Sequence, residues 1–114
     1  EALGIWGDGN AIRDYLYIDD FIQLCLAIID KPMVKGVVTL NAGSGIGTRL
    51  DDLLGRIESV TGKPLRKTQR DKRQVDISRI VIDSSKVYER YGWKPQTSLT
   101  SGLEKTWDWW TNQR

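Results

Sequence analysis

The sequence predicts a single mixed α/β domain with about four helices and several short strands. Apolar residues recur at helical spacing over residues 21–28 and again over residues 50–60, and a period near 3.6 residues is typical of an amphipathic helix. Residues 12–18 instead alternate between apolar and polar side chains, which is the pattern of a half-buried strand. The 114 residues are enough for one domain with a modest core.

The first two strands are expected to form a hairpin. Residues 3–6 have the composition of a short strand, and the segment Gly7-Asp8-Gly9-Asn10 that follows contains the Asp-Gly pair typical of tight turns. Residues 12–18 are then expected to return beside the first strand. Two further short strands are predicted at residues 37–40 and 80–82.

Capping residues define the expected helix ends. The first helix opens at Asp19 and Asp20, with Asp20 and Gln23 at capping-box spacing, and it stops before Pro32. The other boundaries follow the same chemistry, with a polar cap at the start and, for two helices, a glycine at the end. They are Thr48 and Gly62 for the second helix, Asp83 or Ser84 and Tyr91-Gly92 for the third, and Ser98 for the start of the last.

Composition excludes several classes of function. The formal net charge is only +2, so we expect no nucleic-acid and no membrane partner. The chain has no histidine, and its single cysteine, Cys25, lies in an apolar helical stretch; we therefore expect neither a metal site nor a cysteine nucleophile. No apolar run reaches the roughly 20 residues of a membrane span, and no signal peptide is visible, which favours a cytoplasmic location.

Two segments allow other interpretations. Residues 63–73 are rich in lysine and arginine, which is typical of a solvated strand or loop but would also suit an anionic partner. The spacing Gly43-x-Gly45-x-Gly47 stands between a predicted strand and a predicted helix, where a dinucleotide-binding loop would lie. The third glycine comes one position too early for that loop, and no acidic residue follows where a ribose partner is expected. We interpret the loop as a structural turn and keep NADP binding as an alternative.

Arg13 and Arg73 are the candidates for binding a substrate. Each follows a turn-like segment, and a guanidinium group matches two phosphate oxygens, so the pair would suit a diphosphate. Asp76 would hold a sugar or ribose hydroxyl, or pair with a nearby arginine. Asp14 is expected to pair with an arginine or to accept hydrogen bonds from the backbone. The alternative for both arginines is an exposed position or a surface ion pair.

The tryptophans are a second clue. Trp107 and Trp110 share one face of the last predicted helix and are expected in the core. Trp109 points elsewhere and would cover a neighbouring domain. Trp6 stands next to the first turn, where it would lie near a base or sugar.

Several motifs, taken in order, carry a resemblance to a known family. Trp6-Gly7-Asp8-Gly9 followed by IRDYLYIDD at residues 12–20 resembles the "GDG…RDYIYVDD" segment of extended short-chain dehydrogenase/reductase proteins. This family contains NAD-dependent nucleotide-sugar epimerases and dehydratases of the UDP-glucose 4-epimerase type. The remaining motifs are similar as well: residues 41–45 to "NxGSG", residues 73–76 to "RxGD" or "RxxD", residues 83–86 to "D.SK", and residues 91–95 to "LGWxP".

The resemblance implies roles for five residues. In the family the arginines of "RDY" and "RxxD" contact the nucleotide diphosphate, and the aspartate of "RxxD" contacts the ribose; these positions correspond to Arg13, Arg73 and Asp76. The strand before "GDG" meets the base through backbone groups, which places Gly4 and Trp6 there. A valine replaces the glycine of "RxGD" in this sequence, and a β-branched residue restricts the local backbone.

The resemblance also implies that residues 1–114 are the C-terminal, substrate-binding lobe of an extended Rossmann-type enzyme. The family's glycine-rich NAD loop and its Tyr-x-x-x-Lys pair are missing, and the sequence opens at Glu1 directly in a predicted strand. NAD would then be bound by an N-terminal Rossmann half, and this chain alone would be inactive, with no catalytic or cofactor-binding residue of its own. The implied partners are a UDP-sugar and that Rossmann half, in a full-length homodimer.

Other hypotheses remain open. The full-length enzyme would be an epimerase, with a nucleotide-sugar dehydratase or decarboxylase as the alternative. A non-enzymatic module that binds an anionic partner through residues 63–73 is a second hypothesis. A stand-alone NADP-binding protein that uses the Gly43 loop is a third.

Overall fold

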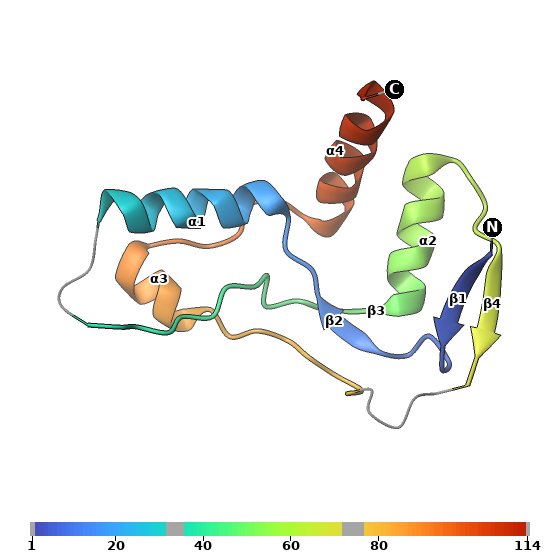
Figure 1. Ribbon diagram of the computed structural model, residues 1–114, viewed down its shortest axis with the longest axis horizontal. Helices are drawn as coiled ribbons and strands as arrows, with labels where there is room; N and C mark the ends of the chain where they lie inside the picture. Colours follow the sequence, from blue (N-terminus) through green and yellow to red (C-terminus); the bar gives the residue numbers. More distant parts are fainter. Residues whose placement is uncertain (1, 32–35, 72–76, 114) are drawn as a thin grey trace.

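The computed structural model describes residues 2–31, 36–71 and 77–113. The molecule is flat, with extents of 50 × 39 × 19 Å (Figure 1). Its radius of gyration is 17.0 Å, whereas a compact domain of this length has about 13 Å. The chain therefore forms a thin layer of elements, not a sphere around one core.

Four helices and four short strands make up the described part of the chain, which confirms the predicted mixed α/β class. The helices are α1 (Ile18–Asp30), α2 (Leu50–Thr61), α3 (Ser85–Tyr91) and α4 (Leu99–Asn112). The strands are β1 (Leu3–Trp6), β2 (Ile12–Asp14), β3 (Gly47–Arg49) and β4 (Lys67–Arg70).

The predicted hairpin between the first two strands is wrong. β1 pairs in parallel with β4, and β2 pairs antiparallel with β3. The turn between β1 and β2 caps α2 instead: the carbonyls of Gly9 and Ala11 accept hydrogen bonds from the amides of Asp51 and Leu50, at 3.2 and 2.9 Å. The first amides of a helix need such acceptors. They are supplied by the turn and not by Thr48, the predicted cap, which lies inside β3.

Gly9 is required at this contact for two reasons. Its φ of +74° lies in the left-handed region, which favours glycine. A methyl group on its Cα would also collide with the Asp51 side chain. The Asp-Gly pair is thus explained by a close approach to α2.

Two other predicted strands are absent among the described residues. Residues 37–40 belong to no strand, and Val37 is 99% exposed. Residues 80–82 form no strand either, but the preceding residues run beside β2: Ser78 accepts from the Ile12 amide at 2.9 Å, and the Ile80 amide donates to Ile12 at 3.0 Å. β2 itself ends at Asp14 and not at residue 18.

The best-buried part of the core lies between α1 and α3. Leu24, Val87 and Trp93 are buried there, and Leu16, Leu40, Ala42 and Tyr91 pack against them. The Trp93 Nε1 group donates to the Asp20 carbonyl at 2.8 Å. Apolar burial and one buried hydrogen bond therefore join the start of α1 to the segment after α3.

Asp20 does not cap α1, contrary to the prediction. The N-cap residue is Tyr17. The buried Asp20 carboxylate instead accepts hydrogen bonds from the amides of Gln96 and Thr97, at 3.2 and 2.9 Å, and from the Thr97 hydroxyl. It ties α1 to the segment that leads into α4, a long-range contact that capping-box spacing does not reveal.

The remaining helix ends follow the predicted chemistry. α2 ends at Gly62 and α3 at Gly92, both in the left-handed region. The Ser98 side chain caps α4 by accepting from the Ser101 amide at 3.2 Å. Ser84 is the N-cap residue of α3, and its neighbour Asp83 accepts from the first helical amide.

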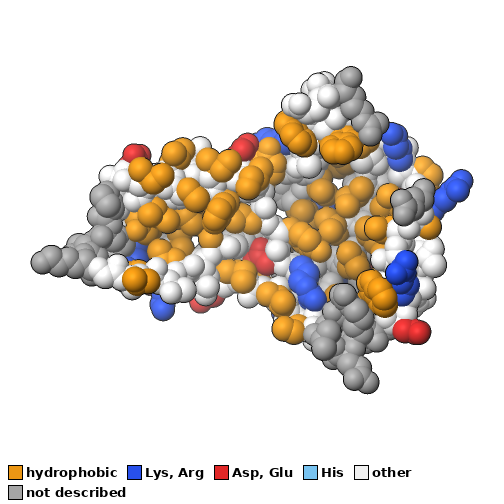
Figure 2. Space-filling view, viewed as in Figure 1, with side chains coloured by type: hydrophobic (Ala, Val, Ile, Leu, Met, Phe, Trp, Pro, Cys, Tyr) orange, Lys and Arg blue, Asp and Glu red, His pale blue; other side chains and the backbone are white. Residues whose placement is uncertain are grey.

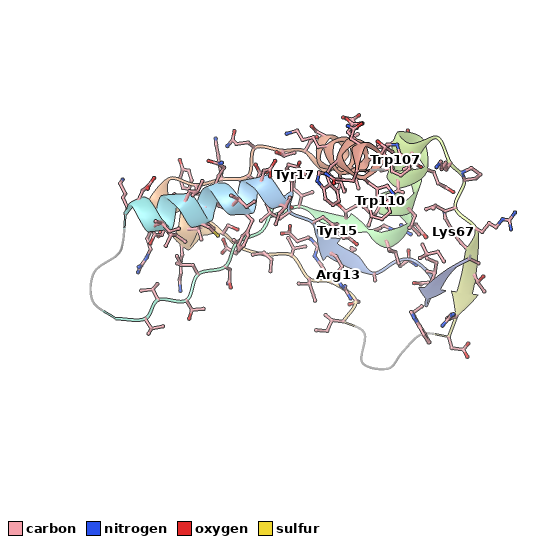
Figure 3. All side chains as sticks on the ribbon, turned by 45° about the horizontal axis from the view of Figure 1, so that its top comes forward. Arg13, Tyr15, Tyr17, Lys67, Trp107 and Trp110 are labelled. Carbon is pink, nitrogen blue, oxygen red and sulfur yellow. The ribbon has the colours of Figure 1, made fainter. Side chains whose placement is uncertain are left out.

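The tryptophans of α4 are less buried than predicted. Trp107 is half-buried, with the Lys63 ammonium group 5.0 Å from its ring centroid, and Figure 3 shows it beside α2. Trp110 is 49% exposed, so its predicted core position is wrong. Trp109 is exposed, as predicted.

One face of the molecule carries extensive apolar surface, seen as orange side chains in Figure 2. The accessible surface of the chain is 8703 Å², whereas a folded monomer of this mass exposes about 6,300 Å². On α1 the residues Ile18, Ile22, Leu26 and Ile29 are all 44–70% exposed. In the described ranges no helix is both long enough and apolar enough to span a membrane.

Candidate functional site

A small cavity lies between the end of β1 and the segment that runs beside β2. Its volume is about 100 Å³. The end of β1, the turn between β1 and β2, and residues 77–78 beside β2 contribute to it. The lining residues are Trp6, Gly7, Asp8, Asn10, Ala11, Ile77 and Ser78.

The backbone of Gly4 and Trp6 faces the sheet edge opposite β4. The Leu3 amide donates to the carbonyl of Arg66, just before β4, at 2.7 Å, and the Gly7 amide donates to that of Arg70, the last residue of β4, at 2.9 Å. Peptide groups of a strand alternate in direction, so those of Gly4 and Trp6 point the other way. This direction agrees with the predicted use of their backbone groups to meet a base.

Arg70 lies across the same part of β1. Its guanidinium carbon is 5.2 Å from the centroid of the Trp6 ring, a cation–π distance. A methyl group at Gly4 would come within 2.6 Å of Arg70 Nε. Gly4 thus leaves room for an arginine that holds the indole of Trp6 in place.

Arg13 lies at the centre of β2, opposite Thr48 of β3. Figure 3 shows Arg13, Tyr15 and Tyr17 one after another along the segment from β2 to α1. The Arg13 side chain is half-buried, and its Nη1 group donates to the Ile12 carbonyl at 2.8 Å. No carboxylate of the described ranges forms an ion pair with it.

Asp14 joins three segments of the chain on the other face of β2. Its carboxylate accepts from the Ser44 amide and hydroxyl, at 2.7 and 2.6 Å, from the Gly45 amide at 2.9 Å, and from the Ile82 amide at 3.1 Å. The prediction that Asp14 bonds to backbone is confirmed. The glycine spacing that suggested a dinucleotide loop is thereby explained by an internal contact.

Gly43 completes this contact. A methyl group on its Cα would collide with Ile82 and come within 2.8 Å of an Asp14 oxygen. Its backbone also exchanges hydrogen bonds with the Ser84 hydroxyl, at 2.9 and 3.1 Å. Three motifs that are far apart in the sequence, at residues 13–15, 41–45 and 83–86, thus meet at one place.

Acidification is expected to destabilise the fold through Asp14. Partial burial on its own raises the pKa of Asp14, but the hydrogen bonds from Ser44, Ile82 and Gly45 outweigh it, and the pKa lies below the ordinary 3.8. A depressed pKa contributes stability that is present above the unfolded value and is lost as the pH falls through the folded one. Thermal unfolding from pH 7 to pH 2 should show a melting temperature that drops below about pH 4, and less steeply in Asp14→Asn. The same pH dependence in both proteins would contradict this assignment.

Two predicted site residues, Arg73 and Asp76, lie outside the described residues. The described residues on either side are held close to the cavity. Arg70 accepts from the Gly7 amide, and Ser78 accepts from the Ile12 amide, each at 2.9 Å.

Sequence reasoning missed three residues near the cavity. Asp8 accepts from the amide and side chain of Asn10, at 3.0 and 2.7 Å. Both residues line the cavity, and the Asx-turn pattern that they form was a readable signal. The sequence pattern places Arg70 in a solvated basic run, and all of β4 is indeed exposed. Nothing local in the sequence reveals its contact with Trp6.

In the described ranges, no cluster of acidic, cysteine or histidine side chains suits a metal ion.

Comparison with known proteins gives consistent results. The chain is 32% identical over 103 residues to the UDP-glucose 4-epimerase of Rhizobium meliloti, covering 90% of this chain and 31% of that protein. The crystal structure of the Thermotoga maritima UDP-glucose 4-epimerase with UDP-glucose superposes with a TM-score of 0.85 at 32% identity, over 99% of this chain and 36% of that one. The Bacillus cereus UDP-glucuronic acid 4-epimerase, in complex with UDP-glucuronic acid and NAD, gives 0.83 at 27% identity, over 100% and 36%.

Residues 1–106 match the family described as GDP-mannose 4,6 dehydratase. The chain therefore belongs to the epimerase/dehydratase class of short-chain dehydrogenase/reductase proteins. It spans about a third of the length of the relatives that it matches. The predicted resemblance and fold class are confirmed.

Proposed function

We propose that this chain binds the nucleotide diphosphate of a sugar nucleotide for an NAD-dependent epimerase of the UDP-glucose 4-epimerase type. A dehydratase or decarboxylase of the same class is the alternative. The observation that carries the proposal is the cavity between Trp6 and Ser78, next to a strand whose Arg13 has no carboxylate partner in the described ranges. In this proposal the Trp6 ring contacts the base, and the Arg13 guanidinium group binds phosphate oxygens.

Arg73 and Asp76 are proposed to complete the site. Their segment is bounded by Arg70, which is bonded to Gly7, and by Ser78, which is bonded to Ile12. Both of these described residues adjoin the cavity or β2. In this proposal Arg73 shares the diphosphate with Arg13, and Asp76 accepts a hydrogen bond from a ribose hydroxyl.

Base recognition is assigned to β1. The peptide groups of Gly4 and Trp6 face the edge opposite β4 and would read the hydrogen-bonding groups of a uracil. Two of the similar structures contain UDP-glucose and UDP-glucuronic acid, which favours a UDP-sugar over other sugar nucleotides.

The rest of the enzyme is proposed to bind NAD and to cover the exposed apolar face. The Ser44 and Gly45 amides already bind Asp14, so the glycine loop does not fit a dinucleotide, and no described residue is assigned to NAD. When bound by the rest of the protein, NAD would supply hydride transfer. The exposed stripe of α1 and the exposed residues 37–39 would pack against that part, which is proposed to be a Rossmann half.

Calorimetric titration of the full-length protein with UDP, UDP-glucose and glucose tests the proposal. UDP and UDP-glucose are expected to bind, because both carry the diphosphate, whereas glucose alone should give no measurable heat. Binding of glucose without UDP would contradict a diphosphate site. Retention on heparin at low salt without UDP binding would favour the non-enzymatic module instead.

A further inference from the structure

The side chain of Asp14 continues the ladder of hydrogen bonds at the point where β2 ends. The segment beside β2 runs parallel to it, with bonds from the Ile12 amide to Ser78 and from the Ile80 amide to Ile12. In a regular parallel ladder the Ile82 amide would next donate to the backbone carbonyl of Asp14. It donates to the Asp14 carboxylate instead, at 3.1 Å.

The other contacts of the carboxylate reach a different part of the chain. Ser44 donates through its amide and its hydroxyl, and Gly45 through its amide, all within 2.9 Å. Every partner is a donor, so the position requires a group that only accepts. An asparagine would turn its amide nitrogen toward backbone N–H groups and leave them without an acceptor.

We propose that Asp14 is the positioning residue for Arg13. The two residues are adjacent on a strand of only three residues, and their side chains point to opposite faces. Asp14 fixes the end of β2 from one face of the strand. It thereby sets the position and orientation of the Arg13 guanidinium group on the opposite face. The same carboxylate holds Ile82, at the end of the segment whose Ile77 and Ser78 line the cavity. It thus fixes Arg13 and one cavity wall relative to each other.

The inference rests on the proposed diphosphate role of Arg13 and is tested with a matched pair of carboxylates. The Asp20 carboxylate likewise accepts hydrogen bonds from backbone amides and a hydroxyl, two amides in its case. It is a suitable control because it ties α1 to the segment before α4 and not to β2. Asp14→Asn and Asp20→Asn should both lower the melting temperature of the full-length protein. Only Asp14→Asn should also weaken UDP-glucose binding, by roughly tenfold. In combination with Arg13→Ala, Asp14→Asn should add almost nothing to the loss.

Each outcome has a defined meaning. Unchanged UDP-glucose affinity in Asp14→Asn, or an equal loss in Asp20→Asn, would overturn the positioning role and leave in place the proposed diphosphate clamp, formed by Arg13 and Arg73. Unchanged affinity in Arg13→Ala would reject the clamp and the positioning role together. If Asp14→Asn does not fold, Ser44→Ala removes the 2.6 Å hydroxyl contact to Asp14, together with the hydroxyl's local bonds to the Ile46 backbone, and keeps the amide contact to Asp14. It should raise the dissociation constant by roughly two- to threefold, and no change in that variant would likewise overturn the inference.

Discussion

Replacing Arg13 with alanine is expected to weaken UDP-glucose binding to the full-length protein by roughly 10- to 100-fold, the range for a lost hydrogen-bonded charge. The guanidinium group has no carboxylate partner in the described ranges, so its removal leaves no buried acid unpaired and costs little stability. The loss should therefore appear in the calorimetric dissociation constant and not in the melting temperature.

Two variants make this test specific. Arg13→Lys keeps the charge but loses the planar fork, and it should recover only part of the affinity. Arg56→Ala removes an exposed arginine whose described partner is Thr100, between α2 and α4, and it should bind UDP-glucose normally. An Arg13→Ala protein with wild-type affinity would show that Arg13 is a surface residue and not part of a clamp.

The largest effect on stability is expected from Trp93→Ala. The side chain is 8% exposed and contacts the fully buried Val87 and Leu24. Its loss should cost about 3–5 kcal/mol in the free energy of unfolding, as for other large-to-small core changes. Because single domains have only about 5–15 kcal/mol in total, this loss removes a large share of the stability, and the urea midpoint should fall steeply. Urea denaturation followed by circular dichroism measures this change.

A second substitution separates packing from hydrogen bonding. Trp93→Phe keeps most of the apolar volume but removes the 2.8 Å bond to the Asp20 carbonyl, so it should cost about 0.5–1.5 kcal/mol, the net contribution of one hydrogen bond. Trp109→Ala, at a 60% exposed position on α4, should change stability by less than about 0.5 kcal/mol. A Trp109→Ala protein as unstable as Trp93→Ala would mean that α4 packs differently.

The helices were predictable because their signals are local. The glycine ends of α2 and α3 and the serine cap of α4 depend on residues within a few positions of each other, and all three agree with the structure. The hairpin failed because an Asp-Gly pair indicates a tight turn without indicating which strands pair. Here the carbonyls of the turn accept hydrogen bonds from the first amides of α2, which need acceptors, and β1 and β2 pair with other strands. Asp20 failed in the same way, because its donors lie at Gln96 and Thr97, far along the chain.

The candidate site was partly predictable for a related reason. Arg13, Gly4 and Trp6 were named from motif order, and the structure shows what each contacts. Arg70 could not be recognised, because its role depends on the parallel pairing of β1 with β4, a long-range feature of the fold. Residues 37–40 have the composition of a strand but belong to no strand. A strand also needs a neighbouring segment to pair with, and local composition does not show whether the fold provides one.

The turn between β1 and β2 makes the candidate cavity and α2 thermodynamically linked. Gly9 and Ala11 supply the acceptors for the first amides of α2, while Gly7, Asp8, Asn10 and Ala11 line the cavity. A ligand that rigidifies this turn also suppresses fraying of the helix, and by reciprocity an intact first helical turn raises the affinity for the ligand by the same factor. Slower hydrogen exchange at Leu50 and Asp51 would therefore report occupancy of a cavity that neither residue lines.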